Sequence, residues 1–309
     1  MTAENLENRI YDAIIAGGGP SGAVLGFLLQ KRGLSCLILE KRTQIDEKIC
    51  GGFLTNRCRE LLLDCGIEMD AFYAHCRRIN GTMTIRSGTE KQFHYRKDRF
   101  GLGVFRKDLD SFLLEQAQEA GAGIHYGEIV REYKKQGAYF QVNGYTGRNF
   151  IWATGVQSVF DLSCISRERA RIKMMRQSTG ISQLVRLEET DLMPDTVYFW
   201  HKGEQPDYFW AIPLPGNTWN IGYWTQSDRT NLRRNFDHGC REYLKAHCKE
   251  IYIVRKARAA LLGNESLADC LPQDGAFCCG DFSGSNNDLT GEGLMQAVES
   301  AGKTADHIL

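Results

Sequence analysis

The chain has 309 residues, 42% of them hydrophobic, and its 38 lysines and arginines balance 38 aspartates and glutamates. This length allows a large core and two structural units. The balanced charge gives no support to nucleic acid or an anionic membrane surface as the main partner. An ordinary soluble enzyme acting on a small molecule, with no nucleic-acid partner, is therefore the starting expectation.

The longest uncharged stretch runs from Ala13 to Leu29 and contains Gly17-Gly18-Gly19-Pro20. It is short for a bilayer span, so it predicts a buried strand followed by a helix and no transmembrane segment. The chain starts with the polar sequence MTAENLENR and lacks the basic region of a secretion signal. This start predicts a cytoplasmic location.

The eleven cysteines are an odd number, and no Cys-x-x-Cys pair occurs among them. Zinc and iron–sulfur sites are therefore unsupported, and we expect no metal. Most of the cysteines are predicted to be small buried side chains in a reducing compartment, as Cys36 is within an apolar run.

The first chemical motif is a strand, a glycine turn and a helix. We predict a strand over Ile10–Ala16, a turn at Gly17–Gly19, a helix over Pro20–Lys31 and a second strand over Ser35–Glu40. The turn and helix start fit G-x-G-x-x-G, in which Gly17 permits the turn, Gly19 the approach of a pyrophosphate, and Gly22 close packing. The helix N-terminus favours phosphate, and Glu40 is spaced to bind a ribose. An adenine dinucleotide site is the prediction; a glycine-rich turn beside a surface glutamate is the alternative.

The middle of the chain predicts one more helix and many strands. Leucines at helical spacing predict a helix from Arg106 to Ala120. Alternating apolar and polar residues predict antiparallel strands within 79–100 and again between Ser182 and Thr225, where aromatic residues are frequent. The pattern turns helical from Arg229 to Glu250, and Ile251–Ala257 predicts another strand.

The last segment predicts a strand at Ala276–Cys279, a turn at Gly280–Asp281 and a helix from about Gly293. The fold class is therefore α/β: a Rossmann-type dinucleotide-binding domain with an inserted, antiparallel β-rich substrate domain. We expect 1–78, 101–165 and 265–309 in the first domain and 79–100 and 166–264 in the second. An aspartate after a strand, followed by a helix N-terminus, suits the ribityl chain and ring of a flavin.

Five motifs together resemble the geranylgeranyl reductase family of FAD-dependent oxidoreductases, which has the p-hydroxybenzoate hydroxylase fold. They span nearly the whole chain in the family's order: Gly17–Gly22, Lys48–Leu54, Phe105–Asp110, Tyr208-x-Trp210-x-x-Pro213, and Gly280-Asp281 with Thr290–Gly293. The sequence departs from the family at Ala153-Thr154-Gly155, which lacks an acid, and at 282–289, which lacks a proline. It ends about one helix after Gly293, whereas the family continues with a helical region that helps enclose a long prenyl chain. We therefore expect that the resemblance does not identify the substrate.

The resemblance implies a role for each matching residue. Glu40 would hold the adenosine ribose, Cys50 to Gly52 would lie beside the isoalloxazine, Arg106 would lie near the phosphate and ribityl region, and Asp281 would bind the ribityl or pyrophosphate part. Gly293 and Leu294 would offer N–H groups to the pyrimidine edge. The full set of cofactor residues is Gly17, Gly19, Pro20, Ser21, Gly22, Glu40, Lys41, Cys50, Gly51, Gly52, Arg106, Asp281, Gly291, Gly293 and Leu294.

Two further roles stay open at this stage. Cys50 is the candidate catalytic residue, either as a proton donor or as a small side chain that lets the ring approach. Tyr208, Trp210 and Pro213 match the family's substrate-side motif; aromatic residues there suit a lipidic or planar substrate, but they also suit an ordinary packed sheet.

We therefore expect an FAD-dependent oxidoreductase. The leading hypothesis is a reductase that passes hydride from reduced flavin to an unsaturated, apolar small molecule, isoprenoid or aromatic. NAD(P)H or an electron-donor protein is the expected reductant, although the chain has no second G-x-G-x-x-G. A flavin monooxygenase or oxidase of the same fold and an electron-transfer flavoprotein are the alternatives.

Overall fold

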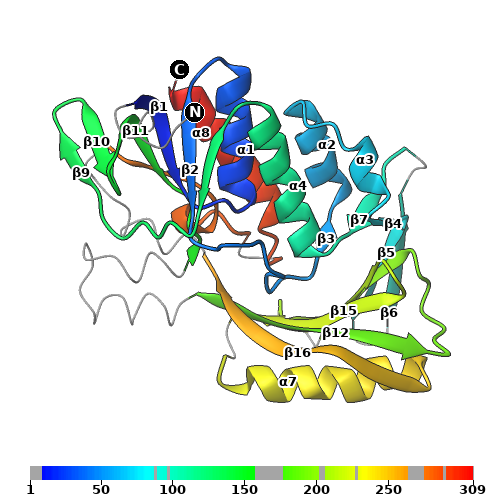
Figure 1. Ribbon diagram of the computed structural model, residues 1–309. Helices are drawn as coiled ribbons and strands as arrows, with labels where there is room; N and C mark the ends of the chain where they lie inside the picture. Colours follow the sequence, from blue (N-terminus) through cyan, green and yellow to red (C-terminus); the bar gives the residue numbers. More distant parts are fainter. Residues whose placement is uncertain are drawn as a thin grey trace.

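The computed structural model describes residues 9–86, 89–95, 98–156, 177–201, 206–226, 229–263, 275–287 and 290–308. Two large sheets dominate it, and Figure 1 shows sheet A with its helices above sheet C. No helix in the described ranges is both long and apolar enough to cross a bilayer.

Sheet A has the order β8-β2-β1-β11-β10-β9, with β17 paired to β11. Strands β8, β2, β1, β11 and β17 run parallel, whereas β10 and β9 are antiparallel. The strands are β1 Ile10–Ala16, β2 Cys36–Glu40, β8 Gly123–Tyr126, β9 Lys134–Gln136, β10 Tyr139–Val142, β11 Tyr145–Trp152 and β17 Phe277–Cys278. The parallel strands carry the N-terminal and the C-terminal parts of the chain in one layer.

Both faces of the central strands β1 and β2 are buried, which explains why these two strands have nearly continuous apolar sequences. In β1, Ala13 and Ile15 belong to the core under the helices, whereas Ile14 and Ala16 pack on the opposite face with Phe150. The helices of this layer are α1 Pro20–Lys31, α2 Asn56–Asp64, α3 Asp70–Tyr73, α4 Arg106–Glu119 and α8 Leu294–Ile308. Apolar residues of α1, α4 and α8 share the first core, so the last helix of the chain packs with the first.

Sheet C has the order β16-β12-β15-β14-β13-β5-β6. Its strands are β5 Gly81–Arg86, β6 Thr89–His94, β12 Ser178–Glu188, β13 Thr196–His201, β14 Tyr208–Leu214, β15 Thr218–Thr225 and β16 Glu250–Leu262. One feature corrects the all-antiparallel expectation, because β13 pairs with β5 in parallel. A small sheet B joins β3 Phe53–Leu54, β7 Gly101–Gly103 and β4 Arg77–Ile79.

Each face of sheet C has its own core. Phe209 packs with Phe236 of α7, which covers the lower face in Figure 1. Because strand side chains alternate, Trp210 and Ile212 lie on the opposite face, toward sheet A. The remaining helical segments are Arg229–Asn231, α7 Leu232–Gly239, the π-helical Cys240–Leu244 and Lys245–His247.

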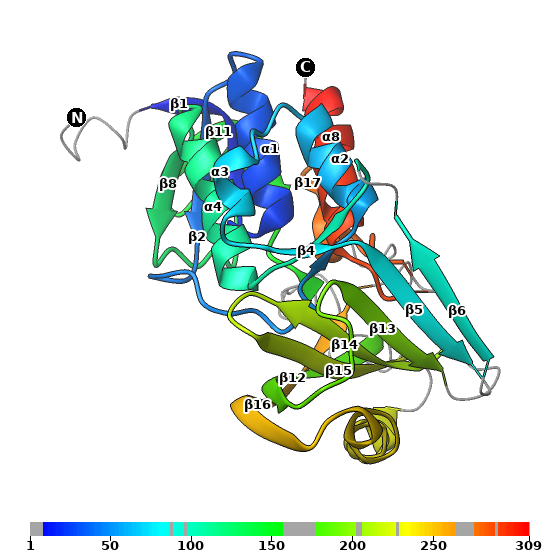
Figure 2. The ribbon, with the colours of Figure 1, turned by 90° about the vertical axis from the view of Figure 1, so that its right-hand side faces the viewer.

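The predicted elements agree closely where glycine and proline mark their ends. The predicted bounds of β1 and α1 are confirmed, and α4 ends one residue earlier than predicted. The turn at Gly280–Asp281 is instead a short 3-10 helix over Gly280–Ser283. The fold class, a Rossmann-type layer with a β-rich insert, is confirmed by this topology, which Figure 2 shows from the side.

Candidate functional site

A cavity of about 1070 Å³ lies between the carboxyl ends of sheet A and the upper face of sheet C. It is larger than the range of about 300–1,000 Å³ usual for small-molecule sites. Strands β1, β2 and β11 end on it at Gly17, Glu40 and Ala153. This is the edge of an open parallel sheet at which ligands generally bind.

The glycines of the first turn build one end of the cavity. Gly17 has a φ of 105°, and a Cβ at this position would lie 2.5 Å from the carbonyl oxygen of Ala153. A Cβ on Gly22 would lie 1.9 Å from the carbonyl oxygen of Gly17, so α1 packs directly on the turn. A Cβ on Gly19 would meet nothing within 4 Å, and Gly19 lines the cavity. The turn is thus closed on its protein side and open where a pyrophosphate would approach.

Glu40 and Lys41 line the same end. The carboxylate of Glu40 accepts hydrogen bonds from the Gly18 N–H at 2.7 Å and from the backbone N–H and Nε of Arg42 at 2.9 and 2.7 Å. Burial alone would raise its pKa, but the Arg42 and Gly18 bonds outweigh burial and hold the pKa below the usual value. Glu40 therefore stays anionic, and a carboxylate can accept further bonds from a ribose hydroxyl.

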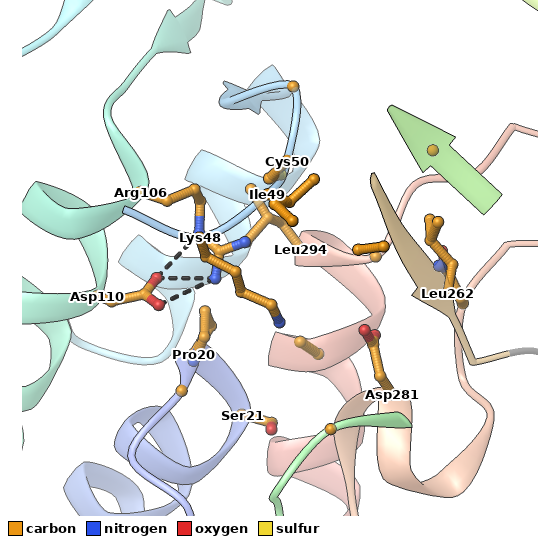
Figure 3. Close-up of a pocket in the computed structure, with 18 of the residues that line it drawn as sticks. Pro20, Ser21, Lys48, Ile49, Cys50, Arg106, Asp110, Leu262, Asp281 and Leu294 are labelled. Atoms are coloured by element: carbon orange, nitrogen blue, oxygen red, sulfur yellow. Dashed lines mark hydrogen bonds and ion pairs between the residues drawn. The ribbon is translucent and has the colours of Figure 1, made fainter. Parts of the chain in front are cut away.

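Arg106 stands at the start of α4 in a buried ion pair. Its Nε and Nη2 donate to the two carboxylate oxygens of Asp110 at 2.9 and 3.1 Å, and both residues are at most 3% exposed. Glu47 accepts bonds from the first two backbone N–H groups of α4. In Figure 3 this pair lies beside Lys48 and Cys50, on one side of the pocket. Cys50 is near enough to the Arg106 guanidinium to interact with it electrostatically.

The loop of Cys50, Gly51 and Gly52 lies against sheet C. Gly52 has a φ of 76°, and its Cβ would lie 2.4 Å from the Val104 carbonyl oxygen, so glycine is required there. A Cβ on Gly51 would lie 2.8 Å from Cδ1 of Ile212. All three loop residues line the cavity, and their place beside an isoalloxazine stays a prediction.

The C-terminal segment completes the opposite wall, where Asp281, Gly291, Gly293 and Leu294 line the cavity. A Cβ on Gly280 would lie 2.5 Å from Oγ of Ser21, so the segment after β17 packs directly against the start of α1. Leu294 begins α8, so free backbone N–H groups of a 15-residue helix start at this wall.

Two polar side chains of this wall were not singled out from the sequence. Asn286 is 6% exposed, and neither atom of its carboxamide has a partner within the described ranges. Glu292 accepts a bond from Thr55 Oγ1 at 2.9 Å, and burial raises its pKa. The open space at Gly19 and the unpaired amide of Asn286 fit a ligand with phosphates at one end and polar groups at the other, as FAD has.

Comparisons with known proteins agree with this geometry. A family model described as an FAD binding domain matches residues 10–149. The digeranylgeranylglycerophospholipid reductase 1 of Methanococcoides burtonii is 24% identical over 306 residues, which cover 94% of this chain and 72% of the relative.

Two solved structures share the fold. A geranylgeranyl bacteriochlorophyll reductase-like protein from Thermoplasma acidophilum has a TM-score of 0.76 at 18% identity, covering 97% of this chain and 78% of that one. The flavin-dependent brominase Bmp2 has a TM-score of 0.75 at 21% identity, covering 97% and 79%. The chain is an FAD-dependent oxidoreductase that is similar to geranylgeranyl reductases.

The substrate-side motif of this flavoprotein divides between the cavity and the core. Tyr208 and Trp210 line the cavity, and the Tyr208 ring stacks on Trp224 with centroids 5.5 Å apart. Pro213 is not among the lining residues, and its carbonyl oxygen packs against Gly103. The predicted substrate contacts of all three residues stay predictions.

The flavoprotein also has cavity residues for which the sequence offered no motif. The loop of Glu128 to Arg131 lines the cavity beside Glu40, and the Glu128 N–H donates to the Glu40 carbonyl at 3.0 Å. Only the pairing of β8 with β2 brings this loop to the site. His201 lines the far end of the cavity, where its Nδ1 lies 3.2 Å from Arg86 Nη2.

Proposed function

We propose that this flavoprotein reduces a carbon–carbon double bond of an apolar small molecule. The observation that carries the proposal is the cavity wall contributed by sheet C, which is mostly apolar and aromatic. Its large apolar and aromatic members are Phe199, Tyr208, Trp210, Ile212, Trp224, Leu261 and Leu262, and its polar members are Ser182 and His201. Such a wall suits an isoprenoid or another unsaturated lipid. The name of the Methanococcoides burtonii relative points to the same class of substrate.

The chain's own residues supply binding and orientation. We assign the pyrophosphate to Gly19 and the start of α1, the adenosine ribose to Glu40 and Lys41, and the ribityl chain to Asp281. The N–H groups at Gly293 and Leu294 would face the pyrimidine edge, where the positive end of the α8 dipole favours negative charge. FAD bound there would supply the hydride chemistry.

Two cavity groups are placed to hold the proton that accompanies the hydride. The Cys50 thiol lies near the Arg106 guanidinium, and the Glu292 carboxyl accepts a hydrogen bond from Thr55 Oγ1. Since burial raises the pKa of Glu292, its carboxyl keeps its proton to a higher pH than an exposed glutamate does. The pH dependence of turnover in Cys50→Ala and Glu292→Gln separates the two groups. In the variant that lacks the proton donor, the fall in turnover at high pH that reports deprotonation of the donor should disappear.

The test of the reductase proposal begins with purified protein and added FAD. We expect a yellow complex that NADH, NADPH or a donor protein reduces under anaerobic conditions, and that is reoxidised by polyprenyl substrates with loss of one double bond. Protein that takes up no FAD would overturn the proposal. The same follows if the complex is reduced and unsaturated lipids leave it reduced.

A second candidate is an oxygen-using flavoenzyme, favoured by the structural likeness to a brominase. Mixing the reduced complex with oxygen in a stopped-flow instrument separates the two functions. A transient absorbing species before the oxidised spectrum supports the oxygen-using enzyme. A single slow oxidation supports the reductase.

A further inference from the structure

The side chain of Asn220 on β15 joins three segments at the back of the cavity. Its Oδ1 accepts a hydrogen bond from Trp210 Nε1 at 3.0 Å, and its Nδ2 donates to the Cys50 carbonyl oxygen at 2.7 Å. The indole nitrogen can only donate and the carbonyl oxygen can only accept, so these partners allow a single orientation of the carboxamide. Asn220 therefore links sheet C to the loop at Cys50 in a defined geometry.

A carboxamide side chain is unusual in a fully buried strand such as β15 and requires hydrogen-bond partners there. Every residue of β15, Thr218–Thr225, is buried, and Asn220 is 1% exposed. A buried carboxamide is costly without partners, and here both of its polar atoms are bonded, one of them to a loop 170 residues earlier. Tertiary contact, rather than strand propensity, accounts for an asparagine at this position.

The bond to Cys50 also sets the direction of the next N–H group. In a trans peptide the carbonyl and the N–H point to opposite sides, and the Cys50 carbonyl faces sheet C. The Gly51 N–H therefore points away from that sheet, and Gly51 lines the cavity. In the described part of the chain no hydrogen-bond partner is found for this N–H. A Cβ at Gly51 would lie 2.8 Å from Cδ1 of Ile212, so the Ile212 side chain packs close to the Gly51 backbone.

We infer that Asn220 is a positioning residue that holds the Cys50–Gly51 peptide so that the Gly51 N–H is presented to the flavin ring. Trp210 fixes Asn220 through its indole N–H, in addition to forming part of the cavity wall. This inference rests on the proposed function, since it concerns the flavin that the function requires. Under this inference the orientation of the Cys50–Gly51 peptide depends on a residue of sheet C and not on the loop alone.

The first experiment measures the loop without any flavin. Iodoacetamide labelling of the apoprotein, followed by trypsin and mass spectrometry, reports Cys50 alone, because the peptide Ile49–Arg57 contains no other cysteine. We expect Asn220→Leu to raise the labelling rate about tenfold, since losing a buried hydrogen bond releases the loop. The matched control is Asn149→Asp, which disturbs a similar amide bond to the Asp12 carbonyl in sheet A.

The second experiment measures the bound flavin. Asn220→Asp should change the visible circular dichroism and the midpoint potential of the FAD complex at pH 8, where a carboxylate cannot donate to the Cys50 carbonyl. Because position 220 is 1% exposed, burial should raise the pKa of this aspartate above its ordinary value, so the change should shrink toward acid pH as the protonated carboxyl regains that donor. Trp210→Phe should give a smaller change of the same sign.

The outcomes separate this inference from the proposed function. Unchanged Cys50 labelling in Asn220→Leu overturns the inference, and so do equal effects in Asn149→Asp, which would mark a general loss of stability. Wild-type protein that binds no FAD overturns the proposed function, while the labelling experiment still decides whether Asn220 holds the loop.

Discussion

Replacing Gly22 with alanine would place a methyl group 1.9 Å from the carbonyl oxygen of Gly17. Real Cβ atoms are essentially never closer than 3.0 Å to such an atom, so α1 must move by at least about 1 Å relative to the turn. The obstacle is backbone rather than a flexible side chain. The glycine turn and the helix start cannot both keep their positions in this variant.

Two opposing effects set the size of the change. Alanine is favoured over glycine inside a helix by about 1 kcal/mol. Forcing a methyl group into a filled space costs about 1–3 kcal/mol, and the upper end applies here because the clash is with the backbone carbonyl of Gly17. The difference of the two effects lowers the free energy of unfolding of Gly22→Ala by about 2 kcal/mol. We also expect FAD binding to weaken at least about tenfold, because the displaced helix start is the phosphate site.

The control is another glycine-to-alanine change in a helix. A Cβ on Gly302 of α8 would meet nothing within 4 Å, so Gly302→Ala should raise stability by about 0.5–1 kcal/mol. Urea unfolding of both variants without flavin, followed by fluorescence titration with FAD, tests the argument. If Gly22→Ala proves as stable as the wild type, the close packing of α1 on the turn is refuted.

Three further predictions follow from the site. Gly19→Ala should change stability by about 1 kcal/mol or less and yet weaken FAD binding about tenfold, since its methyl group would enter the cavity; equal FAD affinity would contradict the pyrophosphate assignment. Arg106→Met should cost about 3–5 kcal/mol because Asp110 stays buried without its partner, and Arg106→Met/Asp110→Leu should recover most of that loss in thermal melts, whereas no recovery would argue against pairing. The pKa of Glu292 is raised in the folded state, so stability from its protonated form is present at acid pH and is lost as the pH rises through that pKa. Glu292→Gln should therefore become the more stable protein as pH rises from about 4 to 8, and a pH-independent difference would refute this.

Helices and strands were predicted correctly from the sequence where a local motif determined both their type and the residue at which they begin or end. The run before Gly17 and the proline at the start of α1 predicted β1 and α1 with their observed bounds. The cavity-lining positions of Cys50, Asp281 and Gly293 also agree with the motifs that named them. Each of these motifs combines a turn with the neighbouring helix or strand, so its structure depends mainly on residues that are close in the sequence.

Long-range contacts explain what the sequence missed. Asn220 sits between tryptophan and isoleucine and looks like an ordinary strand position, because its partner at Cys50 is 170 residues away. Glu292 was visible within its motif, yet its bond to Thr55 spans 237 residues. Helix α2 was missed as well, although Thr55 caps it by accepting from the Cys58 N–H, a signal that a search for N-caps would have found.

The packing of α8 against α1 beside the cavity has a consequence for synthesis. Gly22 and Gly293 are separated by roughly 270 residues, which takes about 15–50 seconds to translate at usual rates. During this time the apolar face of α1 lacks α8, the helix with which it shares a core. The site therefore stays uncovered until α8 has been made, and we expect flavin uptake to follow the synthesis of α8 rather than to guide early folding.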